Sequence, residues 1–278
     1  MPTGVRRWVV IVTLLVGFFT YALNGRGSVL ESPLIVQAFA LDHYKIQWIT
    51  GVEGILSLAS LFTSLYLIKI FGSRWTYLLG TSTLAAGCLG VALAADPYQL
   101  GVMGGVRHCG GFMAIPGSGL LQRLLPGHRR FAYCLYASLV YGGQVAVESL
   151  GALLAFEPSW RTLFVLLGAV GATLSLMTLF LFPDDRPESG PEHGFDFAGA
   201  ALFAVAMGLI FFLLYRGNYL GWRVSTGVWL GGGALAVVMA VFIWRELVAP
   251  EPFLNLKGFT TRTVALAMLA SGFWCASL

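Results

Sequence analysis

Residues 197–215 read FAGAALFAVAMGLIFFLLY and contain no charged side chain. An α-helix rises about 1.5 Å per residue, so a helix of about 20 residues spans the ~30 Å hydrocarbon core of a bilayer. A charged side chain is costly at that depth, and this stretch has none. The stretch therefore predicts a membrane-spanning helix, and the rest of the chain repeats the pattern.

The composition of the whole chain also indicates a membrane protein. Of its 278 residues, 57% are apolar and 11% are charged, whereas a soluble domain carries about 25% charged residues. So few polar side chains cannot cover a water-soluble core of this size, and lipid must contact much of the surface. We therefore predict an all-α integral membrane protein. The net charge of +4 reflects membrane topology, and we expect no nucleic-acid partner.

The same length criterion predicts eight complete spans. They lie near residues 10–38, 47–68, 76–95, 98–121, 132–155, 161–182, 197–215 and 225–244. A ninth apolar run begins at Thr263 and reaches the last residue, Leu278, after about 16 residues, which is too short to cross. We therefore expect the chain to be a fragment whose ninth helix is truncated.

Residues 183–191, PDDRPESGP, form the most polar stretch of the chain. Proline and glycine at this density predict a loop. The loop separates an N-terminal six-helix transmembrane bundle over residues 1–182 from the C-terminal third of the chain. We assign 183–196 to a cytoplasmic loop and 197–246 to two linker helices. Residues 247–278 are then a cytoplasmic loop and the start of the truncated ninth helix.

Basic residues are distributed unequally between the two sides of the predicted spans. If the N-terminus lies inside, eleven Lys and Arg fall on the inner side and four on the outer side. The positive-inside rule therefore predicts a cytoplasmic N-terminus, and we expect a multi-pass protein of the bacterial inner membrane. The inner residues are Arg6, Arg7, Lys69, Arg74, Arg123, Arg129, Arg130, Arg186, Arg245, Lys257 and Arg262.

Five charged residues remain inside the spans: Arg26, Glu31, Glu53, Arg107 and Glu148. Each costs about 2.5–3.5 kcal/mol on insertion scales, so they must be paired or face water. Their depths predict one polar region bordered by the first, second, fourth and fifth spans, while the others face lipid or neighbouring helices. Structural ion pairs and a substrate or proton pathway both remain open.

The pairing of these charges also stays open. Arg26 and Glu31 are five residues apart on one helix and are poor partners for each other. Cross-helix pairs such as Arg26 with Glu53, or Arg107 with Glu31, are candidates. His108, beside Arg107, joins a proton relay or is a hydrogen-bonded packing residue.

No other chemistry competes with a membrane role. The four cysteines show no CxxC spacing, so we expect neither a disulfide framework nor a metal site. The chain has no GxSxG, HExxH or phosphate-loop motif, and we predict neither enzymatic activity nor a cofactor. Asn24-Gly25-Arg26-Gly27 followed by Pro33 interrupts the first span, as expected where a helix bends around a site.

Six helices, a polar central loop and Gly/Pro-broken spans resemble the major facilitator superfamily, and several motifs resemble its fourteen-helix drug:proton antiporter branch of the EmrB/QacA type. Arg107 through Gly111 matches the fourth-helix R-x-x-x-G motif, and Leu23-Asn24 with Pro33 matches the spacing of a first-helix motif. Further resemblances are Trp48 with Thr50, Trp160-Arg161, Phe195 through Gly199, Gly221-Trp222 and Glu251-Pro252-Phe253 through Phe259.

The chain departs from the branch at positions that matter for proton coupling. Asn24 replaces the first-helix aspartate and Glu148 replaces a proline of the antiporter motif. The gating loop after the second span keeps Gly72 and Arg74 but loses its Asp and Arg. We therefore hypothesise that Glu31, Glu53 or Glu148 takes the titratable role, with Arg107 as the charge that favours its ionised form.

The resemblance implies a secondary active transporter that exports amphipathic small molecules or drugs in exchange for protons. Alternating access would rock this half against a C-terminal half outside the sequence. The implied partners are the lipid bilayer, a small-molecule substrate, protons, that second half and a periplasmic adaptor protein. The alternatives are a solute importer of the same fold, a receptor or membrane enzyme with a further domain downstream, and a non-transporting remnant.

Overall fold

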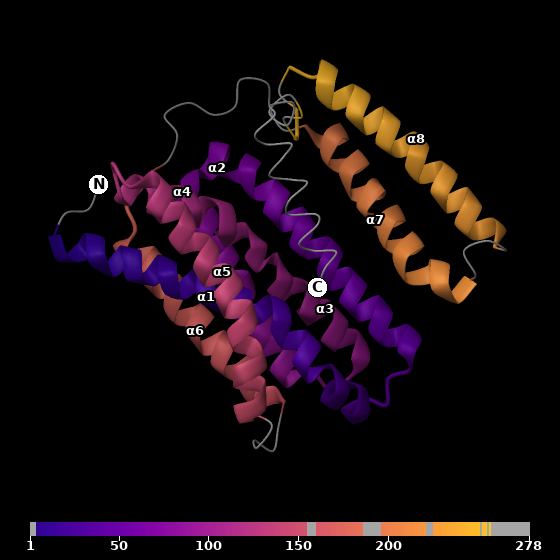
Figure 1. The fold of residues 1–278 in the computed structure, drawn as a ribbon, viewed down its shortest axis with the longest axis horizontal. Helices are drawn as coiled ribbons and strands as arrows, with labels where there is room; N and C mark the ends of the chain where they lie inside the picture. The colour runs from indigo at the N-terminus through magenta and orange to yellow at the C-terminus, as the bar shows by residue number, and fades with distance from the viewer. Residues whose placement is uncertain are drawn as a thin grey trace. The chain divides into compact units, whose positions relative to one another are not determined.

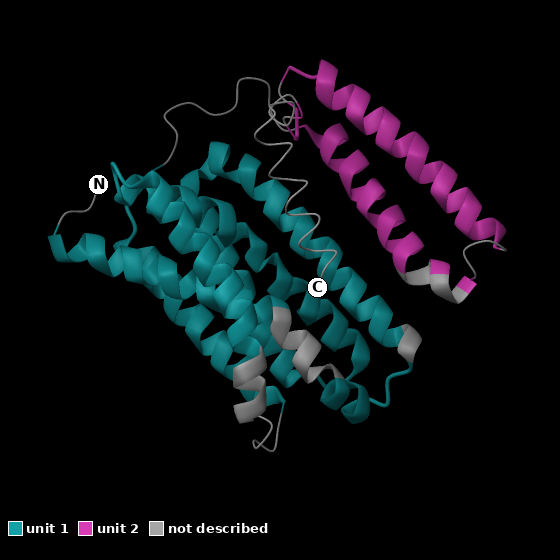
Figure 2. Ribbon diagram, in the orientation of Figure 1, with its two compact units in different colours: residues 1–190 teal, residues 191–278 magenta. Residues whose placement is uncertain are grey.

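A computed structural model describes residues 4–154, 160–185, 196–220, 225–250, 252–254 and 256. Every regular element in these ranges is a helix (Figure 1). The chain divides into two compact units, residues 1–190 and residues 191–278 (Figure 2). The prediction of an all-α fold is confirmed, and the predicted ninth helix from Thr263 lies outside the described residues.

The first unit contains the predicted spans one to six. Its helices are α1 (Gly4–Ala38), α2 (His43–Leu93), α3 (Pro97–His108), the short 3-10 helix η1 (Cys109–Met113), α4 (Ala114–Leu124), α5 (Arg129–Leu154) and α6 (Arg161–Leu181). The second unit contains α7 (Phe197–Leu220) and α8 (Thr226–Val248), which pack on each other.

Two of these elements differ from the predicted spans. Helix α2 is 51 residues long, more than twice what one crossing needs, because the second and third spans meet with no loop. They are joined at Gly72, whose backbone is non-helical (φ 81°, ψ 170°). The fourth span is divided into α3, η1 and α4. Its 3-10 segment immediately follows Arg107 and His108.

Five helical stretches of the described residues are long and apolar enough to cross a membrane. They are Gly4–Gly25, Lys45–Leu93, Arg161–Leu181, Phe197–Leu214 and Thr226–Val248. The fourth span does not meet the length criterion because it is divided into three shorter helices. Helix α5, which contains Glu148, is also not among the five.

The core of the first unit forms where α3 and α6 pack against α2 and where α1 packs against α5 and α6. Val10, Leu14 and Phe18 of α1 are fully buried, as are Tyr77 and Leu84 of α2. Glycines allow the helices to approach closely: a Cβ added at Gly87 of α2 would lie 2.1 Å from the backbone nitrogen of Arg107. The helix that carries Arg107 is therefore held against α2 at backbone contact distance.

Candidate functional site

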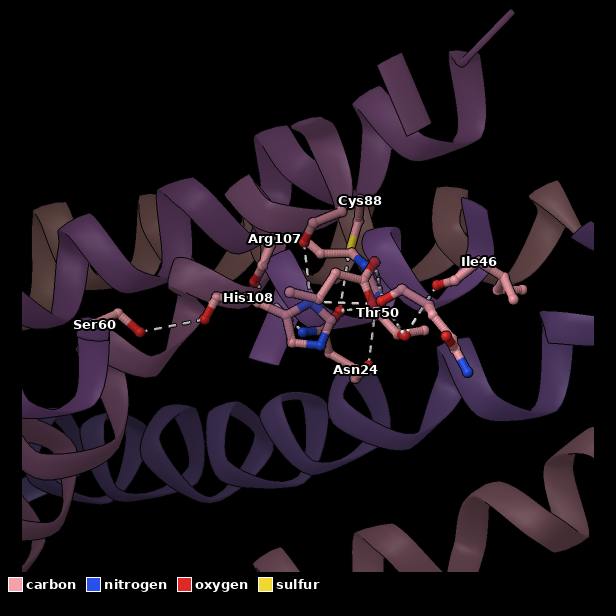
Figure 3. Close-up of polar contacts among 10 residues, drawn as sticks. Asn24, Ile46, Thr50, Ser60, Cys88, Arg107 and His108 are labelled. Carbon is pink, nitrogen blue, oxygen red and sulfur yellow. Dashed lines mark hydrogen bonds and ion pairs between the residues drawn. The ribbon is translucent and has the colours of Figure 1, made fainter. Parts of the chain in front are cut away.

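Arg107 lies at the centre of a buried polar cluster in the first unit. Its side chain, 1% exposed, extends from the last turn of α3. Its Nη2 lies 3.0 Å from Oε1 of Glu53 on α2, and its Nη1 donates to Oδ1 (2.9 Å) and to the carbonyl oxygen (3.0 Å) of Asn24 on α1. One guanidinium therefore ties three helices together, and Figure 3 shows Arg107 with Asn24 and Cys88 beside it.

Small residues make the Arg107–Glu53 distance possible. A Cβ added at Gly104 would lie 2.2 Å from Glu53 Oε1, and one at Gly105 would lie 2.6 Å from Cδ1 of Leu56. Together with Gly87, these glycines remove the side chains that would otherwise separate α2 from α3. The charged atoms then meet at hydrogen-bond distance in a buried site, where Coulomb attraction is stronger than in water.

Three further side chains surround the ion pair. His108 Nδ1 lies 2.9 Å from the carbonyl oxygen of Gly104 and 3.9 Å from Glu53 Oε2. Cys88 Sγ lies 3.5 Å from Asn24 Oδ1, and the ring of Phe164 lies 5.2 Å from Arg107 Cζ. Because a carbonyl can only accept, the short contact of His108 requires a proton on Nδ1.

A cavity of about 30 Å³ lies beside the ion pair. Its lining is apolar except for Thr50, Glu53 and Arg107; the other residues are Ile35, Leu41, Ile46, Ile49, Val91, Leu100 and Phe164. Thr50 Oγ1 donates to the carbonyl oxygen of Ile46 (3.0 Å), which leaves its lone pairs available to accept. The cavity has room for water next to the carboxylate, but drug-sized ligands need about 300–1,000 Å³. The cavity therefore has room for a water molecule and is too small for a drug-sized ligand.

Among the described charges, the structure pairs Arg107 with Glu53, a combination that was not among the candidate pairs. The candidate pairs Arg26–Glu53 and Arg107–Glu31 each include a side chain outside the described residues and stay open. The rotation of each helix about its axis decides which charged residues become partners. The positions of the charges along the chain do not determine that rotation. The side chains of Arg26, Glu31 and Glu148 lie outside the described residues, so their partners and roles stay predictions.

The predicted border of the polar region was incomplete. We expected the third and sixth spans to face lipid or neighbouring helices, but Cys88 on the third and Phe164 on the sixth both contact the cluster. Neither residue is charged, so a search for intramembrane charges misses them. One sequence signal could have indicated that the third span contacts the cluster. Gly80 and Gly87 are seven residues apart, and they lie against backbone atoms of Phe112–Met113 and of Arg107, respectively.

The predicted gating loop, with Gly72 and Arg74, lies where the second and third predicted spans meet inside α2. Asp185, which follows α6, contacts this loop. It was not among the residues predicted for the site. Asp185 accepts from the backbone N–H groups of Ser73 (3.1 Å) and Arg74 (3.0 Å) and from Arg123 Nη1 of α4 (3.2 Å). The carboxylate caps the helix that restarts after Gly72, in the position that a helix N-terminus favours for an anion.

Gly72 is required at this kink for two reasons. Its φ and ψ fall in a region that is essentially restricted to glycine. A Cβ there would also lie 2.8 Å from the carbonyl oxygen and 2.9 Å from Oδ1 of Asp185. The loop therefore keeps its glycine although the neighbouring Asp and Arg of the family pattern are absent.

We predict that Gly72→Ala lowers the free energy of unfolding by about 1–3 kcal/mol, the usual cost of such backbone strain. Gly127→Ala is the matched control, since Gly127 also has positive φ (84°) but open space around its Cβ. Unfolding of the detergent-purified protein, followed by circular dichroism, gives both values. Equal losses would show that the contact with Asp185 adds nothing to the strain.

Relatives of known name resemble the chain over most of its length. The multidrug resistance protein Stp of Mycobacterium tuberculosis (strain CDC 1551 / Oshkosh) is 25% identical over 91% of this chain and 47% of its own length. The probable multidrug resistance protein EmrY of Escherichia coli K12 is 23% identical over 96% of this chain and 52% of its own. The chain thus spans about half the length of the curated relatives it matches.

Solved structures share the fold. A bacterial homologue of the human lysosomal transporter Spinster, in an inward-facing and unoccupied conformation, has a TM-score of 0.55 at 14% identity, covering 93% of this chain and 64% of that one. The peptide transporter POT in complex with sulfate has a TM-score of 0.60 at 15% identity, covering 88% and 53%. The family model of the Major Facilitator Superfamily matches residues 9–278. The chain is a multi-pass membrane protein that belongs to the major facilitator superfamily.

Proposed function

We propose that this chain forms the N-terminal half of a secondary active transporter that exports amphipathic small molecules in exchange for protons. The names of its relatives Stp and EmrY support the substrate class. The observation that carries the proposal is the buried Arg107–Glu53 pair, at 3.0 Å. Among the three candidate carboxylates, Glu53 is the one that the described contacts join to a buried cation.

Glu53 takes over the proton-carrying role that Asn24 cannot perform. Arg107 has two acceptors on Asn24 and one on Glu53. The acceptors on Asn24 do not titrate, so Arg107 stays bound to α1 in every protonation state. Protonation of Glu53 would weaken only the attraction toward α2, because it removes the counter-charge of a buried cation and leaves a neutral acceptor in its place. The proton would therefore change the balance of contacts between α2 and α3.

This imbalance supplies a coupling mechanism. A helix contact that is favourable with ionised Glu53 and unfavourable with neutral Glu53 gives two packing states that protons select between. Gly87, Gly104 and Gly105 keep α2 and α3 in contact, so a change at the ion pair shifts whole helices. Alternating access then moves this half against a C-terminal half.

The substrate would bind outside the ion pair. The cavity of about 30 Å³ beside Glu53 is far smaller than a drug-sized ligand requires. We place the substrate between this half and the C-terminal half, and the proton at Glu53. We also propose a bacterial inner-membrane location with a cytoplasmic N-terminus, on the distribution of basic residues. A periplasmic adaptor protein stays a prediction.

Glu53→Gln tests the proposal, because glutamine keeps a hydrogen-bond acceptor for Arg107 but cannot ionise. We expect proton-driven export to fall at least about fivefold, the lower end of ordinary coupling energies. The protein is expressed from its complete reading frame in cells that lack other exporters. Efflux of the amphipathic dye ethidium is followed by fluorescence, and proton release in everted vesicles is followed with a pH-sensitive dye.

Asp42→Asn is the matched control. Asp42 is an exposed carboxylate that caps α2 and contacts Lys45, and asparagine also caps helices. This variant should export at the wild-type rate. Wild-type export by the Glu53→Gln variant, with loss in Glu31→Gln or Glu148→Gln, would move the proton site to that residue. Accumulation of radiolabelled solute in place of dye export would favour the importer.

A further inference from the structure

Two arginines of the first unit stand apart from the other basic residues near them. Four arginines near the last residues of α4 and α6 bind protein atoms, and we refer to this part of the unit as this end. Arg6 Nε donates to Leu181 O (3.0 Å), Arg7 Nε to Leu124 O (2.9 Å), Arg74 Nη2 to Leu179 O, and Arg123 Nη1 to Asp185 Oδ2 (3.2 Å). The side chains of Arg129 and Arg130, by contrast, form no hydrogen bond or ion pair with any residue that the structure describes.

These arginines line an open hollow at the beginning of α5. The hollow is formed by Gly127, His128, Arg129, Arg130 and Phe131, and all five residues are exposed. The Phe131 side chain is 61% exposed. Two cations and an uncovered aromatic ring therefore share one surface, and no described acidic side chain lies among the residues that line it.

The charges in the hollow are unfavourable as they stand. Arg129 and Arg130 are neighbours in sequence and repel each other, and both lie at the start of α5, where the helix dipole disfavours cations. The same end of the unit provides acceptors for four other arginines but none for these two. An anion bound between them would remove the repulsion and form bidentate contacts with the guanidinium groups.

The position of the hollow points to a lipid anion. The predicted fifth span begins at residue 132, so Arg129 and Arg130 fall at the depth of the headgroups. Phe131 and Tyr133 come directly after them, and Tyr133 is 60% exposed. A dissolved anion would gain nothing from these rings, whereas the glycerol and upper acyl chain of a lipid would cover them.

We propose that residues 127–131 bind the phosphodiester headgroup of an anionic phospholipid in the leaflet at this end of the bundle. Arg129 and Arg130 bind the phosphate oxygens, and Phe131 contacts the adjoining apolar part of the lipid. The site is separate from the Arg107–Glu53 pair and does not depend on the transport proposal. It would stabilise the α4–α5 connection against the membrane surface.

Lipid binding by the purified, delipidated protein tests the proposal. Phosphatidylglycerol and phosphatidylcholine are titrated separately in detergent, and bound lipid is counted by native mass spectrometry. We expect preferential binding of phosphatidylglycerol to the wild type. Arg129→Gln/Arg130→Gln should weaken that binding about thirtyfold, from the usual contribution of two basic residues at a membrane surface. Inorganic phosphate at millimolar concentration should not displace the lipid.

The control is Lys45→Gln/Lys69→Gln, which removes two charges from exposed positions outside the hollow. It should bind phosphatidylglycerol like the wild type. An equal loss in both double variants, equal binding of the two lipids, or displacement by inorganic phosphate would each overturn the proposal. If the glutamine variant does not fold, Arg129→Lys/Arg130→Lys replaces it. Loss of binding there supports the guanidinium contacts, and unchanged binding contradicts them.

Discussion

Replacing Arg107 with leucine is expected to destabilise the first unit by about 3–5 kcal/mol, the usual effect of removing one partner of a buried ion pair. The substitution leaves Glu53, which is 7% exposed, without the cation that lies 3.0 Å from it. It also leaves the two acceptors of Asn24 without their donor. Chemical unfolding of the detergent-purified protein, followed by circular dichroism, measures the loss.

The double variant Arg107→Leu/Glu53→Leu separates the pair from the general effect of a core mutation. Apolar replacement of both partners of a buried ion pair is often close to neutral, so the double variant should recover most of the stability that Arg107→Leu loses. Lys45→Leu is the exposed comparison, because Lys45 and Asp42 are both more than half exposed, and it should cost less than about 1 kcal/mol. A double variant as unstable as the single one would show that the pair is not coupled.

Gly87→Ala should destabilise the first unit more than a glycine-to-alanine change at positions of α2 whose neighbouring atoms are flexible or distant. The new Cβ would lie 2.1 Å from the backbone nitrogen and 2.4 Å from the Cα of Arg107. Backbone atoms cannot rotate away, so α3 must move as a whole. We expect a loss of about 1–3 kcal/mol from overpacking, together with a weakened Arg107–Glu53 contact. Thermal unfolding reports the first effect and dye export reports the second.

Two other glycines of the same helix provide graded controls. At Gly90 the obstruction is Sδ of Met103, at 2.4 Å, and a flexible methionine can move, so Gly90→Ala should be milder. At Gly54 nothing lies within 4 Å, and alanine should stabilise the helix by up to about 1 kcal/mol. If the three variants were equally stable, contact of α2 with the α3 backbone would not be what positions Arg107.

The positions of the helices follow from the sequence, whereas the breaks inside α2 and inside the fourth span do not. Each predicted span corresponds to a helical segment because the cost of placing backbone and side chains in lipid depends on each stretch alone. The kink at Gly72 and the 3-10 segment after His108 depend instead on distant residues. Asp185, for example, caps a helix start 111 residues away. The residues near Gly72 in the sequence do not predict that contact.

The sequence by itself determined that lipid surrounds this protein and where its helices lie. It also identified the unusual polar residues of the predicted spans, which are Asn24, Arg26, Glu31, Glu53, Arg107 and Glu148. These conclusions rest on composition, segment length and the cost of burying charge, which are local properties of the chain. Only the tertiary structure decided that Arg107 pairs with Glu53 and that Cys88 and Phe164 border them. Those contacts depend on how far α2, α3 and α6 rotate and approach. The approach is set by glycine-to-backbone contacts between segments remote in sequence.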